Sequence, residues 1–138
     1  MRIRAASVKD QEQLVAMRGK LWPEATLEEL QSAPMPGEVF VAEDEGGLIG
    51  FVEVSLRSHA DGCETHPVGF LEGWYVEERV RRRGVGRVLL EAAEGWARKQ
   101  GCKEMASDTW IDHELSQRAH EGLGFEAVDR CVHYKKRL

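Results

Sequence analysis

The chain has 138 residues, a length that fits a single domain spanning residues 1–138. Apolar residues make up 42% of the chain, which is enough for a packed core, and no apolar run approaches the roughly 20 residues that cross a bilayer. The net charge of −5 argues against non-specific nucleic-acid binding, and the polar start of the chain argues against a signal peptide, so we expect a cytoplasmic protein without a nucleic-acid or membrane partner.

Strand and helix signals alternate along the first half of the chain. Ser7 with Asp10, and Thr26 with Glu29, have the spacing of capping boxes that open helices. Gly46-Gly47 between two apolar runs is typical of a hairpin turn. The expected elements are a strand over 1–5, a helix from Ser7 to about Lys20, a short helix from Thr26 to before Pro34, and strands over 39–44 and 48–58.

The second half continues this alternation. The clearest helix runs from Gly84 to Lys99, because apolar residues recur there every three or four positions: Val85, Val88, Leu89, Ala92, Ala93, Trp96 and Ala97. The other expected elements are strands over 68–76 and 103–108, a helix over 111–123 and a final strand over 128–135. This order predicts an α/β protein of the α+β type, with a mixed sheet and helices on its faces.

A Gly-rich turn joins the strand over 68–76 to the long helix. It reads Arg81-Arg82-Arg83-Gly84-Val85-Gly86, and Arg87 follows. The N-terminus of a helix has free amide N–H groups and a partial positive charge, so it binds anions. The glycines let the backbone approach a phosphate, and the arginines add charge and forked donors. The turn therefore predicts a phosphate-binding site on a chain that is otherwise acidic.

This strand–turn–helix stretch resembles the pyrophosphate-binding motif of the GNAT superfamily of N-acetyltransferases, and the element order matches that fold along essentially the whole chain. The resemblance implies the GNAT acyltransferase fold, a mixed and mostly antiparallel sheet that is splayed at its centre, with acetyl-CoA as the acetyl donor. The pantetheine of acetyl-CoA would pair like an extra strand with Trp74, Tyr75 and Val76, and the Val76 N–H would polarise the thioester carbonyl. The pyrophosphate would bind at Arg82, Arg83, Gly84, Val85, Gly86 and Arg87.

Four further segments resemble a narrower group, the short, chromosomal type of aminoglycoside 6'-N-acetyltransferase. The segments are Leu21-Trp22-Pro23, Phe70-Leu71-Glu72-Gly73, Glu104-Met105-Ala106-Ser107-Asp108-Thr109, and Ser116 through Gly124-Phe125 with the closing His133-Tyr134-Lys135-Lys136-Arg137. The third segment is the most specific of the four. This resemblance implies transfer of acetyl to the 6'-amino group of aminoglycoside antibiotics, which confers resistance, and a homodimer formed through the C-terminal strands.

Glu72 and Asp108 are the candidate catalytic carboxylates. Glu72 has the strand parity of Phe70, Trp74 and Val76, which places a carboxylate on a largely apolar face, and Asp108 ends the neighbouring strand. Both could meet where the two strands splay, and a polycationic acceptor needs carboxylates around the amine that is acylated. By resemblance, Glu72 would bind this amine or deprotonate it through water, because a protonated amine is not a nucleophile, and Asp108 would hold or deprotonate the same region.

By resemblance, further residues would contact the two substrates. Trp22 would wall the acceptor, His59 stands where relatives have a Tyr in that wall, and Asp129 matches an acidic acceptor contact. His113 replaces an Asn and could still donate to CoA. His120 takes the place of the Tyr that protonates the leaving thiolate, and its imidazole could act as that acid.

We expect direct attack of the amine on the thioester, without a covalent enzyme intermediate and without a metal. No recognisable base accompanies Cys63, Cys102 or Cys131 in the sequence, and their spacing matches neither a zinc site nor a disulfide framework. Two alternatives remain open at this point. The acceptor could be a polyamine, another small amine or a protein N-terminus, or the chain could be a non-catalytic CoA-binding module.

Overall fold

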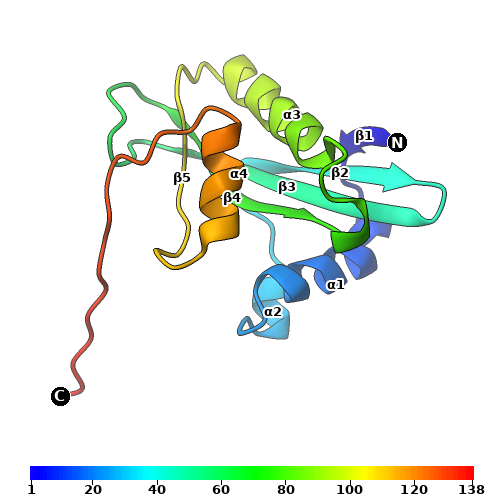
Figure 1. Cartoon of the computed structure of the whole chain (residues 1–138), viewed down its shortest axis with the longest axis horizontal. Coiled ribbons are helices and arrows are strands. Elements are labelled where there is room, and N and C mark those ends of the chain that lie inside the picture. Colours follow the sequence, from blue (N-terminus) through cyan, green and yellow to red (C-terminus); the bar gives the residue numbers. More distant parts are fainter.

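One five-stranded sheet forms the centre of the structure, a computed structural model that describes residues 1–138 (Figure 1). The strands follow one another across the sheet in chain order: β1 (Arg2–Ala5), β2 (Gly37–Asp44), β3 (Gly47–Arg57), β4 (Val68–Val76) and β5 (Met105–Ser107). The first four strands pair antiparallel, and β5 pairs parallel to β4. The expected mixed and mostly antiparallel sheet is confirmed.

Helices cover both faces of this sheet (Figure 1). They are α1 (Gln11–Leu21), α2 (Leu27–Leu30), α3 (Val85–Lys99) and α4 (Glu114–Gly122), with short 3-10 turns at η1 (Val8–Asp10) and η2 (Glu78–Val80). Leu14 and Met17 of α1 pack in a buried cluster on one face, and Leu89 and Ala93 of α3 pack in a second cluster on the other. No helix is both long enough and apolar enough to cross a membrane.

The predicted helix starts agree with the capping signals. Thr26 caps α2, because its hydroxyl accepts a hydrogen bond from the Glu29 N–H at 3.2 Å and the Glu29 carboxylate accepts one from the Thr26 N–H at 3.0 Å. The Asp10 carboxylate accepts from the Ser7 N–H at 2.8 Å, which starts the η1–α1 segment. The later helix starts at Glu114 rather than at 111, so its first predicted turn is a loop.

A β-bulge interrupts β4 at Glu72. Gly73 lies opposite Glu53 of β3, and Leu71 lies opposite Val54, so Glu72 is an extra residue without a partner in the register. A bulge of this kind leaves one residue unpaired and redirects its side chain, and such bulges are common beside active sites. The bulge therefore places the one acidic residue of β4 outside the regular ladder.

The bulge also reverses the alternation of side chains along β4. Trp74 and Val76 pack against the buried cluster under α3. Glu72 and Phe70 instead share a face, where both contact the guanidinium of Arg57. The expectation that Glu72, Trp74 and Val76 share a face is therefore wrong, because one inserted residue moves every later side chain to the other side of the sheet.

The chain beyond α4 differs most from the sequence expectation. Residues 125–138 form neither helix nor strand, so the strand predicted over 128–135 is wrong for the single chain. Figure 1 shows this segment running away from the sheet, and Val128, Val132 and Tyr134 are largely exposed. Alternating apolar residues favour a strand only where a neighbouring strand accepts its backbone hydrogen bonds, and here the segment has none.

Candidate functional site

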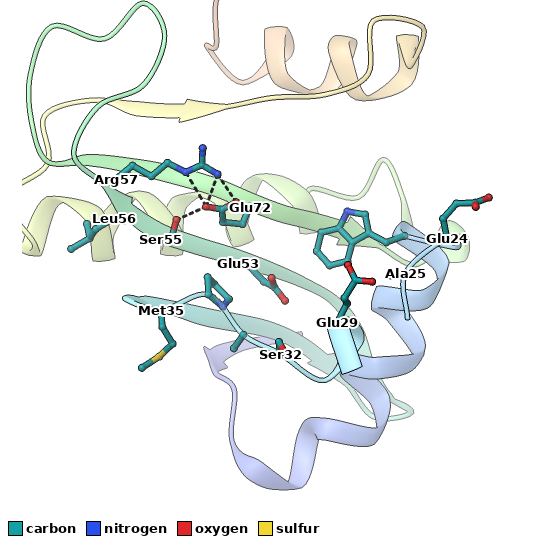
Figure 2. Close-up of a pocket in the computed structure, with 13 residues that line it drawn as sticks. Glu24, Ala25, Glu29, Ser32, Met35, Glu53, Ser55, Leu56, Arg57 and Glu72 are labelled. Carbon is teal, nitrogen blue, oxygen red and sulfur yellow. Dashed lines mark hydrogen bonds and ion pairs between the residues drawn. The ribbon is translucent and has the colours of Figure 1, made fainter. Parts of the chain in front are cut away.

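A cavity of about 740 Å³ opens between the α1–α2 connection and strands β3 and β4 (Figure 2). Its lining carries four carboxylates and one guanidinium: Glu24, Glu29, Glu53, Glu72 and Arg57. A hollow with this excess of acidic groups favours a cationic ligand. It has room for a small organic molecule, because such pockets usually measure about 300–1,000 Å³.

Glu72 lines this cavity and is held by two neighbours on β3. Its carboxylate accepts a hydrogen bond from the Ser55 hydroxyl at 2.5 Å and a forked pair from Arg57, the shortest at 2.9 Å (Figure 2). The side chain is 26% exposed, so water and a ligand can still reach it. The site thus contains an oriented, accessible carboxylate at the position that the sequence singled out.

Glu53 is a second carboxylate of the cavity, and the sequence reasoning missed it. It is 4% exposed and pairs with Arg18 of α1, whose Nε lies 2.5 Å from the Glu53 Oε1. Burial raises the pKa of Glu53, with Arg18 opposing this effect. The parity of β3 could have indicated it, because Glu53 interrupts an otherwise apolar run between Phe51 and Val54.

Trp22 forms a wall of the same cavity. It follows α1 directly, and its ring packs on Phe51 with centroids 6.3 Å apart. The ring also lies directly over Gly73, where a Cβ atom would come within 2.7 Å of the Trp22 Cη2. Gly73 therefore allows the indole to reach the cavity beside Glu72.

On the other side of β4, the sheet splays open. Pairing with β5 covers only Gly69 to Leu71, so β4 has no neighbour on that side from the bulge onward. The Glu77 N–H donates to Ile49 of β3 at 2.9 Å, and backbone groups alternate along a strand, so the Val76 N–H points into the splay. A free strand edge is available there to an extended ligand.

The Gly-rich turn lies at the end of this splay, at the N-terminus of the 15-residue helix α3. Gly84 caps α3 with φ 83°, a left-handed conformation that favours glycine, and Arg82 also has a positive φ of 64°. Gly86 packs against the ring of Trp74, whose Nε1–H donates to the Gly86 carbonyl at 3.0 Å. Arg82, Arg83 and Arg87 are exposed around this helix start. The arrangement can bind a phosphate group.

His120 of α4 also reaches the splay. Its ring packs edge-on against Trp74, with centroids 5.4 Å apart, and against Phe125 at 5.2 Å. Its Nδ1 lies 2.7 Å from the Ser116 carbonyl, which can only accept, so Nδ1 carries a proton. Its Nε2 lies 2.8 Å from the Ser107 hydroxyl at the end of β5. This imidazole can therefore exchange a proton through Nε2.

Several predicted residues lie outside the acidic cavity. Asp108 follows β5 as an exposed residue, and it is not part of the lining that includes Glu72. His59 and Asp129 are likewise exposed and absent from that lining. His113 is an exposed residue at the N-terminus of α4. The single chain thus brings Trp22 and Glu72 together and leaves the other acceptor candidates apart from them.

The structure places no group of three or more His, Cys, Asp or Glu side chains where they could hold a metal ion. Cys63, Cys102 and Cys131 are free thiols, and burial raises the pKa of the first two. These thiols are separate from the acidic cavity.

Comparison with known proteins gives a consistent result for sequence and fold. Residues 8–125 match the acetyltransferase (GNAT) family. An aminoglycoside N(6')-acetyltransferase type 1 of Stenotrophomonas maltophilia is 42% identical, over 99% of this chain and 93% of the relative. A protein of the same name from Klebsiella aerogenes is 39% identical, over 99% of this chain and 96% of the relative.

Solved structures agree with this result. The aminoglycoside antibiotic 6'-N-acetyltransferase AAC(6')-IG from Acinetobacter haemolyticus superposes with a TM-score of 0.91 at 35% identity, covering 100% of this chain and 99% of that one. AAC(6')-Iy, in complex with the bisubstrate analogue CoA-S-monomethyl-acetylneamine, superposes with a TM-score of 0.86 at 36% identity, covering 99% and 98%.

Proposed function

The chain belongs to the acetyltransferase (GNAT) family, and from this premise we propose that it transfers the acetyl group of acetyl-CoA to the 6'-amino group of aminoglycoside antibiotics. The observation that carries the proposal is the oriented Glu72 carboxylate in an acidic cavity, with the splayed edge of β4 behind it. An aminoglycoside is a polycation, so it suits a cavity lined by four carboxylates.

Acetyl-CoA would occupy the splay between β4 and β5. The pyrophosphate would bind the amides and side chains at the start of α3: Arg82, Arg83, Gly84, Val85, Gly86 and Arg87. The pantetheine would lie along Trp74, Tyr75 and Val76, with the Val76 N–H donating to the thioester oxygen as negative charge develops there. His113 would contribute a polar contact to CoA from the start of α4.

The reaction would proceed by direct attack. The substrate ammonium gives a proton to Glu72, directly or through water, and its nitrogen lone pair then forms the new N–C bond while the C–S bond of the thioester breaks. The leaving thiolate receives a proton, for which an imidazolium at His120, protonated on both nitrogens, is our candidate donor through Nε2. The acetylated nitrogen loses its second proton to water. Asp108 would hold the amine from the outer side of the splay.

We further propose that two copies associate through residues 125–138. Support comes from the exposed apolar residues of this segment and from β5, whose outer edge has no neighbouring strand. Asp129 and His59 would reach the acceptor only in such a dimer. We also propose that residues 1–138 act as one catalytic domain in the cytoplasm, where a reducing environment keeps the three thiols free.

A paired-substrate assay tests this function. We expect purified protein to release CoA from acetyl-CoA with kanamycin or tobramycin, and to be inactive with an aminoglycoside that has a 6'-hydroxyl. Glu72→Gln should lower kcat by about a hundredfold or more, because it removes the proton acceptor. The control is Glu91→Gln, an exposed residue of α3 outside the cavity, which should retain wild-type turnover.

Turnover of spermidine or a peptide amine without turnover of either 6'-amino drug would show that the acceptor is that amine and not an aminoglycoside. Full activity of Glu72→Gln would remove Glu72 from the catalytic role. Binding of acetyl-CoA without turnover of any amine would indicate a CoA-binding module.

A further inference from the structure

The guanidinium of Arg57 lies beside Glu72, where the acceptor amine is proposed to bind. Arg57, the last residue of β3, directs its guanidinium at Glu72 inside the acidic cavity (Figure 2). The Cζ atom of the same guanidinium lies over the ring of Phe70, 3.4 Å from the ring centroid. The stacking and the forked hydrogen bonds together fix its position, although the side chain is 45% exposed.

The hydrogen bonds to Glu72 are unequal between its two oxygens. Oε2 accepts from the Ser55 hydroxyl at 2.5 Å and from the Nη2 and Nε of Arg57 at 3.0 and 3.2 Å. Oε1 accepts only from the Nη2 of Arg57, at 2.9 Å. A carboxylate has about four lone-pair sites, so the remaining capacity is on Oε1. Ser55 and Arg57 therefore select the oxygen that a ligand can use.

Arg57 is also the one basic residue in the cavity lining, among Glu24, Glu29, Glu53 and Glu72. Two of these acids have other partners. Glu53 pairs with the buried Arg18, and Glu29 accepts from the N–H of Thr26. Glu53 still acts on Glu72 through its charge, but the guanidinium of Arg57 is the cation that pairs with Glu72 directly.

We propose that Arg57 is a positioning and specificity-determining residue: it orients Glu72 with Oε1 free for the acceptor amine, and its charge favours the neutral, nucleophilic form of that amine. A cation beside an ammonium disfavours the protonated state, so it assists the proton loss that must precede attack. The same repulsion weakens binding of the protonated acceptor. Arg57 thus lowers the affinity for the protonated acceptor and raises the reactivity of the bound amine. This role rests on the acetyl transfer proposed above.

Two substitutions separate charge from geometry. Arg57→Met keeps a long side chain over Phe70 without charge, and Arg57→Lys keeps the charge without the fork. The readout is the single-turnover rate of acetyl transfer to kanamycin against pH, together with the KM values for kanamycin and acetyl-CoA.

In wild type we expect the rate to rise with pH, and we call this rise the pH limb. For Arg57→Met we expect the limb to lie about one pH unit higher, and the KM for kanamycin at neutral pH to fall by about tenfold. Arg57→Lys should keep the wild-type pH limb and KM, at a lower maximal rate. Ser55→Ala should also lower the rate without moving the limb. Arg2→Met, on an exposed arginine of β1 near Glu43, is the matched control and should match wild type throughout.

An unchanged pH limb or a raised acceptor KM in Arg57→Met would overturn the proposal, as would equal displacement of the limb in the Met and Lys variants. Unchanged acetyl-CoA affinity by calorimetry shows that a variant is folded. If wild type acetylates no aminoglycoside, the proposed function itself fails. This outcome is distinct from an active enzyme whose pH limb is the same with and without Arg57.

Discussion

Gly73 shapes the acidic cavity because it has no side chain. A Cβ atom at this position would lie 2.7 Å from Cη2 and 3.0 Å from Cζ2 of Trp22, and 3.3 Å from the ring of Phe51. These atoms belong to packed aromatic rings, which cannot yield as a flexible side-chain end does. The wall of the cavity therefore depends on the absence of a side chain at position 73.

Gly73→Ala should displace Trp22 and impair acceptor binding. We expect the KM for a 6'-amino aminoglycoside to rise by about tenfold, because a displacement of an ångström at a binding residue has effects of this size or larger. The KM for acetyl-CoA should stay within about twofold, since the donor lies on the other side of β4. Steady-state kinetics with each substrate varied in turn measures both.

The control is Gly95→Ala on α3, where a Cβ atom would meet nothing within 4 Å. This variant should bind both substrates normally and should be more stable, by about 1 kcal/mol, because alanine favours a helix interior. An unchanged acceptor KM in Gly73→Ala would mean that Trp22 is not part of the acceptor wall.

At this scale, the sequence identifies residues that belong to contiguous motifs, such as Glu72 and Trp22. It does not identify Glu53 or Arg57, because their significance comes from neighbours on other elements. Glu53 meets Arg18 across 35 positions of the chain, and Arg57 meets Glu72 across 15. No local pattern records such pairings.

The elements around the cavity are joined by the buried pair of Arg18 and Glu53. Arg18 lies on α1, 1% exposed, and its Nη1 also donates to the carbonyl of Leu30 at the end of α2. One side chain therefore connects α1, α2 and β3. A buried ion pair is costly to break from one side, because the remaining charge has no water to solvate it.

Glu53→Ala should lower the free energy of unfolding by about 3–5 kcal/mol, because it leaves the guanidinium of Arg18 buried without its counter-ion. Urea unfolding followed by circular dichroism measures this change as a lower midpoint. Lys20→Ala removes an exposed pair with Glu77 and should leave the urea midpoint nearly unchanged, because solvent screens such a pair. Equal losses in the two variants would show that the buried pair has no special weight.

Elements with strong local signals were predictable, and α3 is the clearest example. Its predicted range of 84–99 differs from the observed Val85–Lys99 by one residue. The bulge at Glu72 was not predictable, because an inserted residue leaves the apolar pattern of β4 intact while it changes the face of each later side chain. The expected shared face of Glu72, Trp74 and Val76 assumed a regular strand.

At the scale of the whole molecule, residues 125–138 expose apolar side chains that no other part of the chain covers. Val132 is 68% exposed and Tyr134 is 90% exposed, and the segment also carries Lys135, Lys136 and Arg137. The alternation that predicted a strand is real, but a strand needs a partner, and the single chain supplies none. The alternation of apolar residues in the sequence thus indicates a strand that can form only when two copies associate.

Removal of residues 126–138 should convert the proposed dimer into a monomer. Light scattering after gel filtration measures the mass, and we expect about twice 15.6 kDa for the full chain. The melting temperature of the full chain should rise with protein concentration, since association stabilises the folded state by mass action. A full chain that is monomeric at every concentration tested would contradict the dimer.

The bulge at Glu72 has a consequence for how this protein can change over time. It places Phe70 and Glu72 on the face that carries Arg57, and Trp74 and Val76 on the side of α3. On the proposed assignment, mutations that reshape the acceptor cavity fall on one surface of β4, and those that change the affinity for acetyl-CoA fall on the other. A variant can therefore gain or lose activity on one antibiotic while its affinity for acetyl-CoA stays the same. The range of drugs can change while the reaction is conserved.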